Sequence, residues 1–184
     1  MLFVIDVILA IILAVIVIGK LLLRFCGKED VRVDTAAPFA VEEKTAERIV
    51  LAKKLVFHNE GTSCATLMDA FVRPQLPYEQ YAGIEARGKA EREGEVREDD
   101  YFEAVIVQKK GYARGEDTLN VYAKVMLMPR KGMTLDEALS HMVDLPMDFI
   151  WMETGRMPWH YRKVRLVLSA EELAALAGVT FAED

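Results

Sequence analysis

One short segment near the C-terminus combines side chains that bind anions with side chains that stack or pack. Within an acidic chain it gathers cationic and aromatic residues at close spacing: Arg156, Trp159, His160, Tyr161, Arg162, Lys163 and Arg165. On a strand, Tyr161, Lys163 and Arg165 share one face, whereas His160 and Arg162 share the other. Such a strip suits anionic lipid headgroups or an acidic patch on a partner protein. The alternative is an edge strand that carries charge to prevent aggregation, and the sequence leaves both interpretations open.

One segment of the chain has the glycine and lysine spacing of a nucleotide-binding loop, but the neighbouring residues do not suit a nucleotide. Residues Gly83–Lys89 have the G-x-x-x-x-G-K spacing of a phosphate-binding loop. Ala90 follows, so no hydroxyl is available for magnesium, and Glu85 places an anion inside the phosphate cradle. The residues before the loop do not form the buried hydrophobic strand that this motif requires. We therefore predict no nucleotide cofactor.

The His, Cys, Asp and Ser residues of the sequence do not occur at the spacings typical of a metal site or of a catalytic nucleophile. His58 and Cys64 lie six residues apart across a break in the pattern, and His141 precedes Asp144 without a second pair of ligands. No serine lies in a nucleophile elbow. We predict no metal site and interpret Cys64 as a small buried residue of an amphipathic helix. The alternative is a membrane-tethered enzyme or small-ligand-binding domain, whose reactive candidates are Cys64 with His58, or His141 and His160.

The N-terminal segment between Leu2 and Leu23 has the composition of a membrane-spanning helix, with Asp6 and Lys20 as its only ionisable side chains. As a helix it is roughly 33 Å long, close to the ~30 Å thickness of a bilayer's hydrocarbon core. The main alternative is a signal peptide, which requires a basic start, a shorter apolar run and small residues at a cleavage site. Only the α-amino group precedes this run, and GKLLLRFCGK follows it without such a site. We therefore predict an uncleaved single-pass transmembrane anchor over residues 1–26.

The charges that flank this segment predict its orientation. The basic residues near its end all follow the apolar run: Lys20, Arg24, Lys28 and Arg32. The positive-inside bias then places the N-terminus outside and the rest of the chain in the cytoplasm, as in a bacterial inner-membrane protein. Two cysteines fit a reducing compartment.

One face of the same helix could pack against another helix. Asp6, Ala10 and Ala14 recur every four residues, and small residues on one face allow a partner helix or a second copy to approach closely. The alternative is that Asp6 lies at the wet interface and that the two alanines only fill the span. The sequence does not decide between them.

Composition limits the class of protein. The 184 residues include 23 Lys+Arg and 29 Asp+Glu, for a net charge of −6, and the first 28 residues hold three of the bases but only one acid. The rest of the chain is therefore strongly acidic, which argues against a nucleic-acid partner because phosphate is repelled. Its length suits one domain with a hydrophobic core.

Hydrophobic periodicity predicts the elements of that domain. Residues 27–41 mix charge, glycine and proline without a period and are interpreted as a juxtamembrane linker. Two capping boxes, Thr134–Glu137 and Ser169–Glu172, mark helix starts. In order, we predict helices over 42–58 and 62–74, strands over 82–90, 101–109 and 118–128, a helix over 134–143, strands over 148–153 and 159–168, and a helix over 169–178.

These elements give an α+β fold: a single transmembrane helix, then one cytoplasmic domain over 42–184 with a mainly antiparallel sheet packed by helices. Since no catalytic constellation stands out, we predict an accessory or assembly subunit of a membrane complex that acts by protein binding. Its partners would be the lipid bilayer and other membrane subunits or its own copies. The helix face at Asp6 and the basic-aromatic strip are its candidate contact sites.

Overall fold

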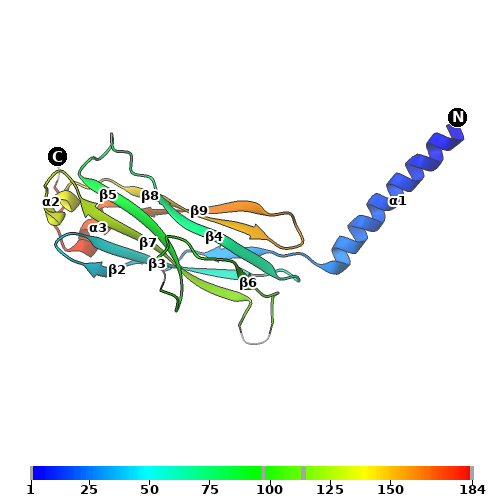
Figure 1. The fold of residues 1–184 in the computed structure, drawn as a ribbon, viewed down its shortest axis with the longest axis horizontal. Coiled ribbons are helices and arrows are strands. Elements are labelled where there is room, and N and C mark those ends of the chain that lie inside the picture. The colour runs from blue at the N-terminus through cyan, green and yellow to red at the C-terminus, as the bar shows by residue number, and fades with distance from the viewer. Residues whose placement is uncertain (1, 97, 113–114, 183–184) are drawn as a thin grey trace.

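The computed structural model describes residues 2–96, 98–112 and 115–182, of which residues 2, 3 and 23–26 are described by their backbone alone. Its elements are α1 (Leu2–Cys26), β1 (Val31–Asp34), β2 (Phe39–Lys44), β3 (Ile49–Asn59), β4 (Ala65–Pro74), β5 (Ile84–Arg92), β6 (Val105–Val107), β7 (Thr118–Pro129), α2 (Leu135–Ser140), β8 (Leu145–Thr154), β9 (His160–Leu168) and α3 (Ala170–Ala177). Figure 1 shows an elongated body of strands from which α1 projects.

The N-terminal apolar helix is present and stands apart from the domain. Between Val4 and Leu22 its mean hydropathy is 2.8, and none of this stretch is buried against the rest of the chain. The helix is therefore compatible with a membrane anchor or with a signal sequence. Asp6, Ala10 and Ala14 lie within it at helical spacing and share one exposed face.

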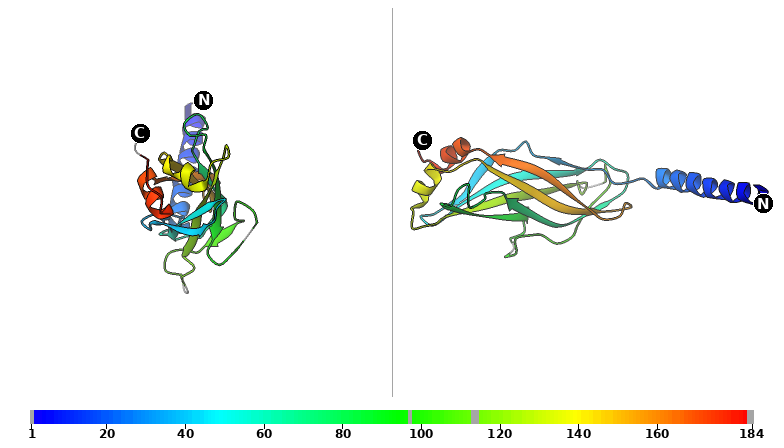
Figure 2. Two further views of the ribbon diagram at one scale, coloured as in Figure 1. Left: turned by 90° about the vertical axis from the view of Figure 1, so that its left-hand side faces the viewer. Right: turned by 90° about the horizontal axis from the view of Figure 1, so that it is seen from above.

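The domain consists of two antiparallel sheets packed face to face. One sheet has the order β1-β3-β7-β5, with β2 also paired to β3, and the other has the order β6-β4-β8-β9. The short helices α2 and α3 lie together at the end of the body opposite α1 (Figure 2). Both helices begin at the predicted caps, where the Thr134 and Ser169 side chains accept from the backbone N–H groups of Glu137 and Glu172.

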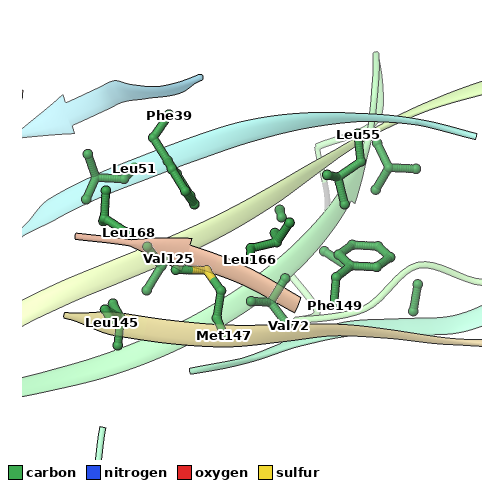
Figure 3. Packing of buried hydrophobic residues seen from close by; sticks show 14 of the residues in the cluster. Phe39, Leu51, Leu55, Val72, Val125, Leu145, Met147, Phe149, Leu166 and Leu168 are labelled. Atoms are coloured by element: carbon green, nitrogen blue, oxygen red, sulfur yellow. The ribbon is translucent and has the colours of Figure 1, made fainter. Parts of the chain in front are cut away.

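The space between the sheets is filled by alternate residues of each strand. In β7 every second side chain from Leu119 to Leu127 is buried, as a strand with one face in the core requires. Leu51, Leu55, Val125, Phe149 and Leu166 meet there from opposite sheets (Figure 3). Phe57 packs its ring against Phe149 and Trp151, with centroids 5.8 and 5.2 Å away.

The mainly antiparallel sheet is confirmed, but the two helices predicted over 42–58 and 62–74 are wrong, because both regions are strands. In β3 the outward residues Val50, Ala52 and Val56 are also apolar, so the sequence does not show the alternation of apolar and polar residues that marks a strand. In β4 a bulge at Asp69, which has a φ of 52°, shifts the register with β8. The buried side chains therefore change phase within β4, and the resulting spacing imitates a helix.

Two further predictions about connections need correction. The segment 27–41 is not an unstructured linker, because β1 and the first residues of β2 pair with β3 in the five-stranded sheet. The strands predicted over 101–109 and 118–128 do not form a hairpin. Only Val105–Val107 is a strand, and it pairs with β4, whereas β7 pairs with β3 and β5 in the other sheet. Residues 113–114 of that predicted turn lie outside the described residues.

Candidate functional site

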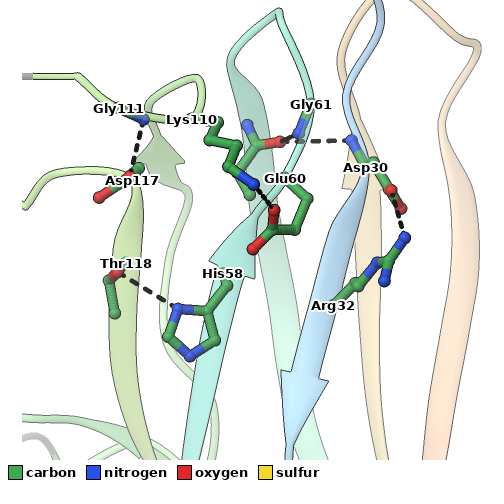
Figure 4. Close-up of polar contacts among 10 residues, drawn as sticks. Asp30, Arg32, His58, Glu60, Gly61, Lys110, Gly111, Asp117 and Thr118 are labelled. Carbon is green, nitrogen blue, oxygen red and sulfur yellow. Dashed lines mark hydrogen bonds and ion pairs between the residues drawn. The ribbon is translucent and has the colours of Figure 1, made fainter.

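The chain leaves α1 through a segment that is fastened to the domain, which we call the junction (Gly27–Asp30). The carbonyl oxygen of Lys28 accepts from the backbone N–H of Thr62 at 3.0 Å, and that of Asp30 accepts from Glu60 at 2.8 Å. Figure 4 shows this corner, where Lys110 also contacts Glu60. The junction therefore continues the β1–β3 pairing and couples the helix directly to the sheet.

Asn59, of which only 2% is exposed, holds the junction together. Its Oδ1 accepts from the N–H groups of Asp30 at 3.2 Å and Gly61 at 2.9 Å. Its Nδ2 donates to the carbonyl oxygens of Ser63 at 2.8 Å and Val107 at 3.3 Å. One buried amide thus joins the junction, the β3–β4 turn and a strand of the opposite sheet.

Close backbone approach explains a glycine in this corner. A Cβ atom at Gly61 would lie 2.4 Å from the carbonyl oxygen of Lys28 and 2.5 Å from the N–H of Asp30. Because both neighbours are backbone atoms, neither can move aside without breaking the pairing. The sequence shows only a break in the pattern between His58 and Cys64, and no local signal marks Asn59 as the residue that holds the junction.

A second contact joins the junction to the turn between β8 and β9, the hairpin tip (Gly155–Trp159). The Glu29 carboxylate accepts from the backbone N–H groups of Arg156 at 3.1 Å and Met157 at 3.0 Å. Burial opposes its charge, but these N–H donors, its own N–H and nearby His160 hold the pKa of Glu29 below its usual value. No feature of the sequence marked Glu29, because its partners are backbone groups far along the chain.

Acidification should release the hairpin tip. Since the pKa of folded Glu29 is lowered, its contribution to stability is complete above about pH 4.5, its unfolded value, and is lost as the pH falls through the folded value. We expect Glu29→Gln to lower the free energy of unfolding at pH 7 by about 1–3 kcal/mol, because charge-assisted hydrogen bonds are lost.

The measurement is urea unfolding of the full chain in detergent at several pH values. Asp148 also has a lowered pKa, so the difference between wild type and Glu29→Gln isolates the Glu29 contribution. That difference should shrink as the pH falls below about 4.5 and through the lowered pKa of folded Glu29. A difference that stays constant with pH would contradict the assigned role.

The hairpin tip and the start of β9 present exposed aromatic side chains. Trp159 is 64% exposed and Tyr161 58%, and their rings meet edge to face with centroids 6.2 Å apart. Arg156 donates from Nε to the hydroxyl of Ser63 at 3.2 Å, which leaves the rest of its guanidinium outward. His160 is exposed and its Nδ1 lies 3.1 Å from the carbonyl oxygen of Pro158.

The outer face of the four-stranded sheet carries an apolar strip, which we define as Met68, Phe71, Ile150, Met152 and Tyr161. These residues are neighbours by register: Met68 faces Met152, and Phe71 faces Ile150 on adjacent strands. Tyr161 lies beside Met152 on β9. All are at least partly exposed, so this strip is open to solvent.

A basic border follows the apolar strip at Lys163 and Arg165. Lys163 Nζ lies 3.0 Å and Arg165 Nε 2.9 Å from the carboxylate of Asp148, whose side chain is 5% exposed. The hydrogen bond from Arg165 lowers the pKa of Asp148, with Lys163 adding to the effect. Because two exposed cations share one buried carboxylate, the border carries a net positive charge.

Arg162, which the sequence predicts on the other face of the strand, makes different contacts from those of Lys163 and Arg165. Its guanidinium donates to the carbonyl oxygen of Val31 at 2.7 Å and to buried Glu153 at 3.1 Å. It also lies over the Trp151 ring, 5.5 Å from the centroid. Arg162 therefore ties β9 to β1 of the opposite sheet, so the predicted strip divides into two faces.

The outer face of the five-stranded sheet contrasts with the apolar strip. Lys124 bridges Glu42 at 2.7 Å and Glu91 at 2.9 Å, and Lys54 pairs with Glu93 at 2.9 Å. Two open depressions of about 400 and 210 Å³ lie on this face, and Glu42, Glu91 and Lys124 line both of them. Its charges are largely matched within the face itself.

The reactive candidates are not assembled into a site. Cys64 is exposed, so the prediction of a buried residue is wrong; the residue lies in the β3–β4 turn rather than on a helix. His58 Nδ1 lies 3.4 Å from the Thr118 hydroxyl, and His141 is exposed beside α2. Among the described residues, no group of three His, Cys, Asp or Glu side chains could hold a metal ion.

Comparison with known proteins gives a weak similarity of fold. No protein-family model and no curated protein sequence matches the chain. The GAE domain of GGA2p from Saccharomyces cerevisiae is 8% identical with a TM-score of 0.32, covering 78% of this chain and 99% of that chain. The yeast GGA1_GAE domain is 6% identical with a TM-score of 0.31, covering 71% and 98%. At these values the similarity says nothing about what this chain binds.

Proposed function

We propose that the protein is a single-pass, membrane-anchored accessory or assembly subunit that binds another protein of a membrane complex. The observation that carries this proposal is the difference between the two outer faces of the domain. One face has its charges paired internally, whereas the other exposes the apolar strip of Met68, Phe71, Ile150, Met152 and Tyr161 beside a positive border. Exposed apolar area with a polar border is typical of protein-binding surfaces.

The anchor supports this assignment by restricting where a partner can lie. Val4–Leu22 is long and apolar enough to span a bilayer, and Asp6, Ala10 and Ala14 offer a face for helix packing. The basic residues that follow the span favour a cytoplasmic domain at the inner membrane. A partner would then be another membrane subunit, or a second copy, whose cytoplasmic surface is acidic and apolar.

Site-specific photocrosslinking in native membranes tests the assigned face. We expect a photoreactive residue at Ile106, on the outer face of β6 and 61% exposed, or at Ile150 to give one discrete adduct. The matched control is Ala52, which lines a depression on the opposite outer face and should give none. Equal adducts from both faces, or an adduct from Ala52 alone, would contradict the proposal.

A further inference from the structure

We propose that the hairpin tip rests on the anionic headgroup layer of the bilayer beside the end of α1, with Trp159 and Arg156 as its lipid contacts. This inference depends on the membrane anchor of the proposed function. It divides the basic-aromatic segment into two surfaces: a lipid-facing tip, and a strand face at Lys163 and Arg165 that remains available to protein.

The chain itself limits how far the tip can lie from the membrane. The apolar stretch ends at Leu22, and Glu29 holds the tip only seven residues later. Residues 23–26 are helical and rise about 6 Å, and the next three residues add at most about 10 Å. A headgroup layer is about 5–8 Å thick on each side of the hydrocarbon. Glu29 therefore lies at most about 16 Å from the hydrocarbon, a distance that the exposed side chains of the tip have to bridge in part to reach the headgroups.

The arrangement of elements places the tip on the correct end of the domain. The end of the β8–β9 hairpin lies beside the C-terminal end of α1, whereas α2 and α3 lie at the far end (Figure 2). Glu29 is 8% exposed and its two hydrogen bonds fix the backbone of the tip against the junction. The contact would therefore be preformed rather than assembled from a mobile loop.

The side chains suit a headgroup layer. Tryptophan and tyrosine concentrate at membrane interfaces because their rings are amphipathic, and arginine binds phosphate with several donors. Met157 adds an apolar side chain that is 51% exposed. Two acids of this corner have a cation beside them: Glu60 contacts Lys110, and Asp30 lies 3.1 Å from Arg32. Exposed Lys28 adds another cation between the helix and the tip.

Fluorescence quenching by spin-labelled lipid tests the contact on the full chain. The protein is reconstituted into vesicles of phosphatidylcholine, with or without phosphatidylglycerol, that contain a headgroup-labelled lipid. The chain has two tryptophans, and Trp151 is 2% exposed, so the emission that Trp159→Phe removes belongs to Trp159. We expect that emission to be quenched at least about twofold, more in the anionic vesicles, while Trp151 is unaffected.

A matched control moves the reporter along the same strand. Val167→Trp in the Trp159→Phe background gives a similarly exposed ring on the outer face of β9, since Val167 is 54% exposed. Eight residues of strand separate the two positions by roughly 26 Å, so the ring at 167 should not be quenched by labelled lipid.

The outcomes separate this inference from the anchor. Alkaline carbonate extraction is applied first, and release of the protein would overturn both the anchor and the tip contact. Retention with Trp159 unquenched by lipid but quenched by aqueous acrylamide would overturn the tip contact alone. Protection from both quenchers would place the tip against protein, which in these vesicles is a second copy of the chain, and would overturn the lipid contact. Equal quenching in neutral and anionic vesicles would overturn the anionic preference.

Discussion

Asn59→Ala is expected to lower the free energy of unfolding by about 3 kcal/mol, one of the two largest effects that we predict for a single feature of this chain. The Asn59 side chain is 2% exposed and makes four hydrogen bonds to backbone groups. The alanine substitution leaves these backbone groups without their hydrogen-bond partner at a buried position where water cannot easily replace it. Each buried polar group without a partner costs about 1–3 kcal/mol, and relaxation of the junction recovers part of the sum.

Two variants make this prediction specific. Asn59→Asp keeps the acceptor for Asp30 and Gly61 but turns an oxygen toward the carbonyl groups of Ser63 and Val107, so it should destabilise as much as alanine. Asn120→Ala removes an exposed hydrogen bond to Glu93 on the outer face of the five-stranded sheet. We expect this variant to lower the free energy of unfolding by less than about 0.5 kcal/mol. Urea unfolding of the full chain in detergent measures all three. A loss in Asn59→Ala no larger than that in Asn120→Ala would contradict the role of Asn59.

The junction changes how the anchor acts on the domain. A segment without pairing would let the domain turn freely under the membrane. Here Lys28 and Asp30 pair with the β3–β4 turn, and Glu29 holds the hairpin tip. The chain between the end of α1 and its first paired residue, Lys28, is therefore short, which limits how far the domain can move from the end of the helix.

Local sequence signals predicted the parts of the fold that local rules control. The caps at Thr134 and Ser169, the strand alternation in β7 and the two faces of β9 all depend on residues within one element. The regions 42–58 and 62–74 failed because their alternation is incomplete. Outward apolar residues hide it in β3, and the bulge at Asp69 interrupts it in β4.

The site depends on contacts that no local pattern encodes. Glu29 meets the hairpin tip across 127 residues of sequence, and Asn59 reaches Val107 across 48. Exposed Cys64 was misplaced for the same reason, since its burial followed from a helix that does not form. The basic-aromatic residues were recognisable by composition. How these residues divide could be seen only from the register of β8 with β9. Some lie at the hairpin tip, some lie on the outer face of the sheet, and Arg162 contacts β1.

Inverting the charges around α1 should invert the protein in the membrane. In the wild type we expect the domain to lie in the cytoplasm, because Lys20 lies near the C-terminal end of the span and three more basic residues, Arg24, Lys28 and Arg32, follow it. The variant replaces these residues by glutamine (Lys20, Arg24, Lys28 and Arg32) and adds four lysines after Met1. Since lysine and arginine near the span set its orientation, the domain of this variant should lie outside in most molecules.

The exposed thiol of Cys64 provides the readout. Cys26→Ser leaves Cys64 as the chain's remaining cysteine, and its exposure makes it accessible to a membrane-impermeant maleimide. In intact spheroplasts the wild-type orientation should leave Cys64 unlabelled until the membrane is permeabilised, whereas the charge-inverted variant should label directly, on the order of tenfold more. The control carries the four glutamines without the added lysines and should give mixed labelling, because no charge bias remains. Labelling of Cys64 in intact wild-type spheroplasts would place the domain outside, and the partner face would then have to be sought on that side of the membrane.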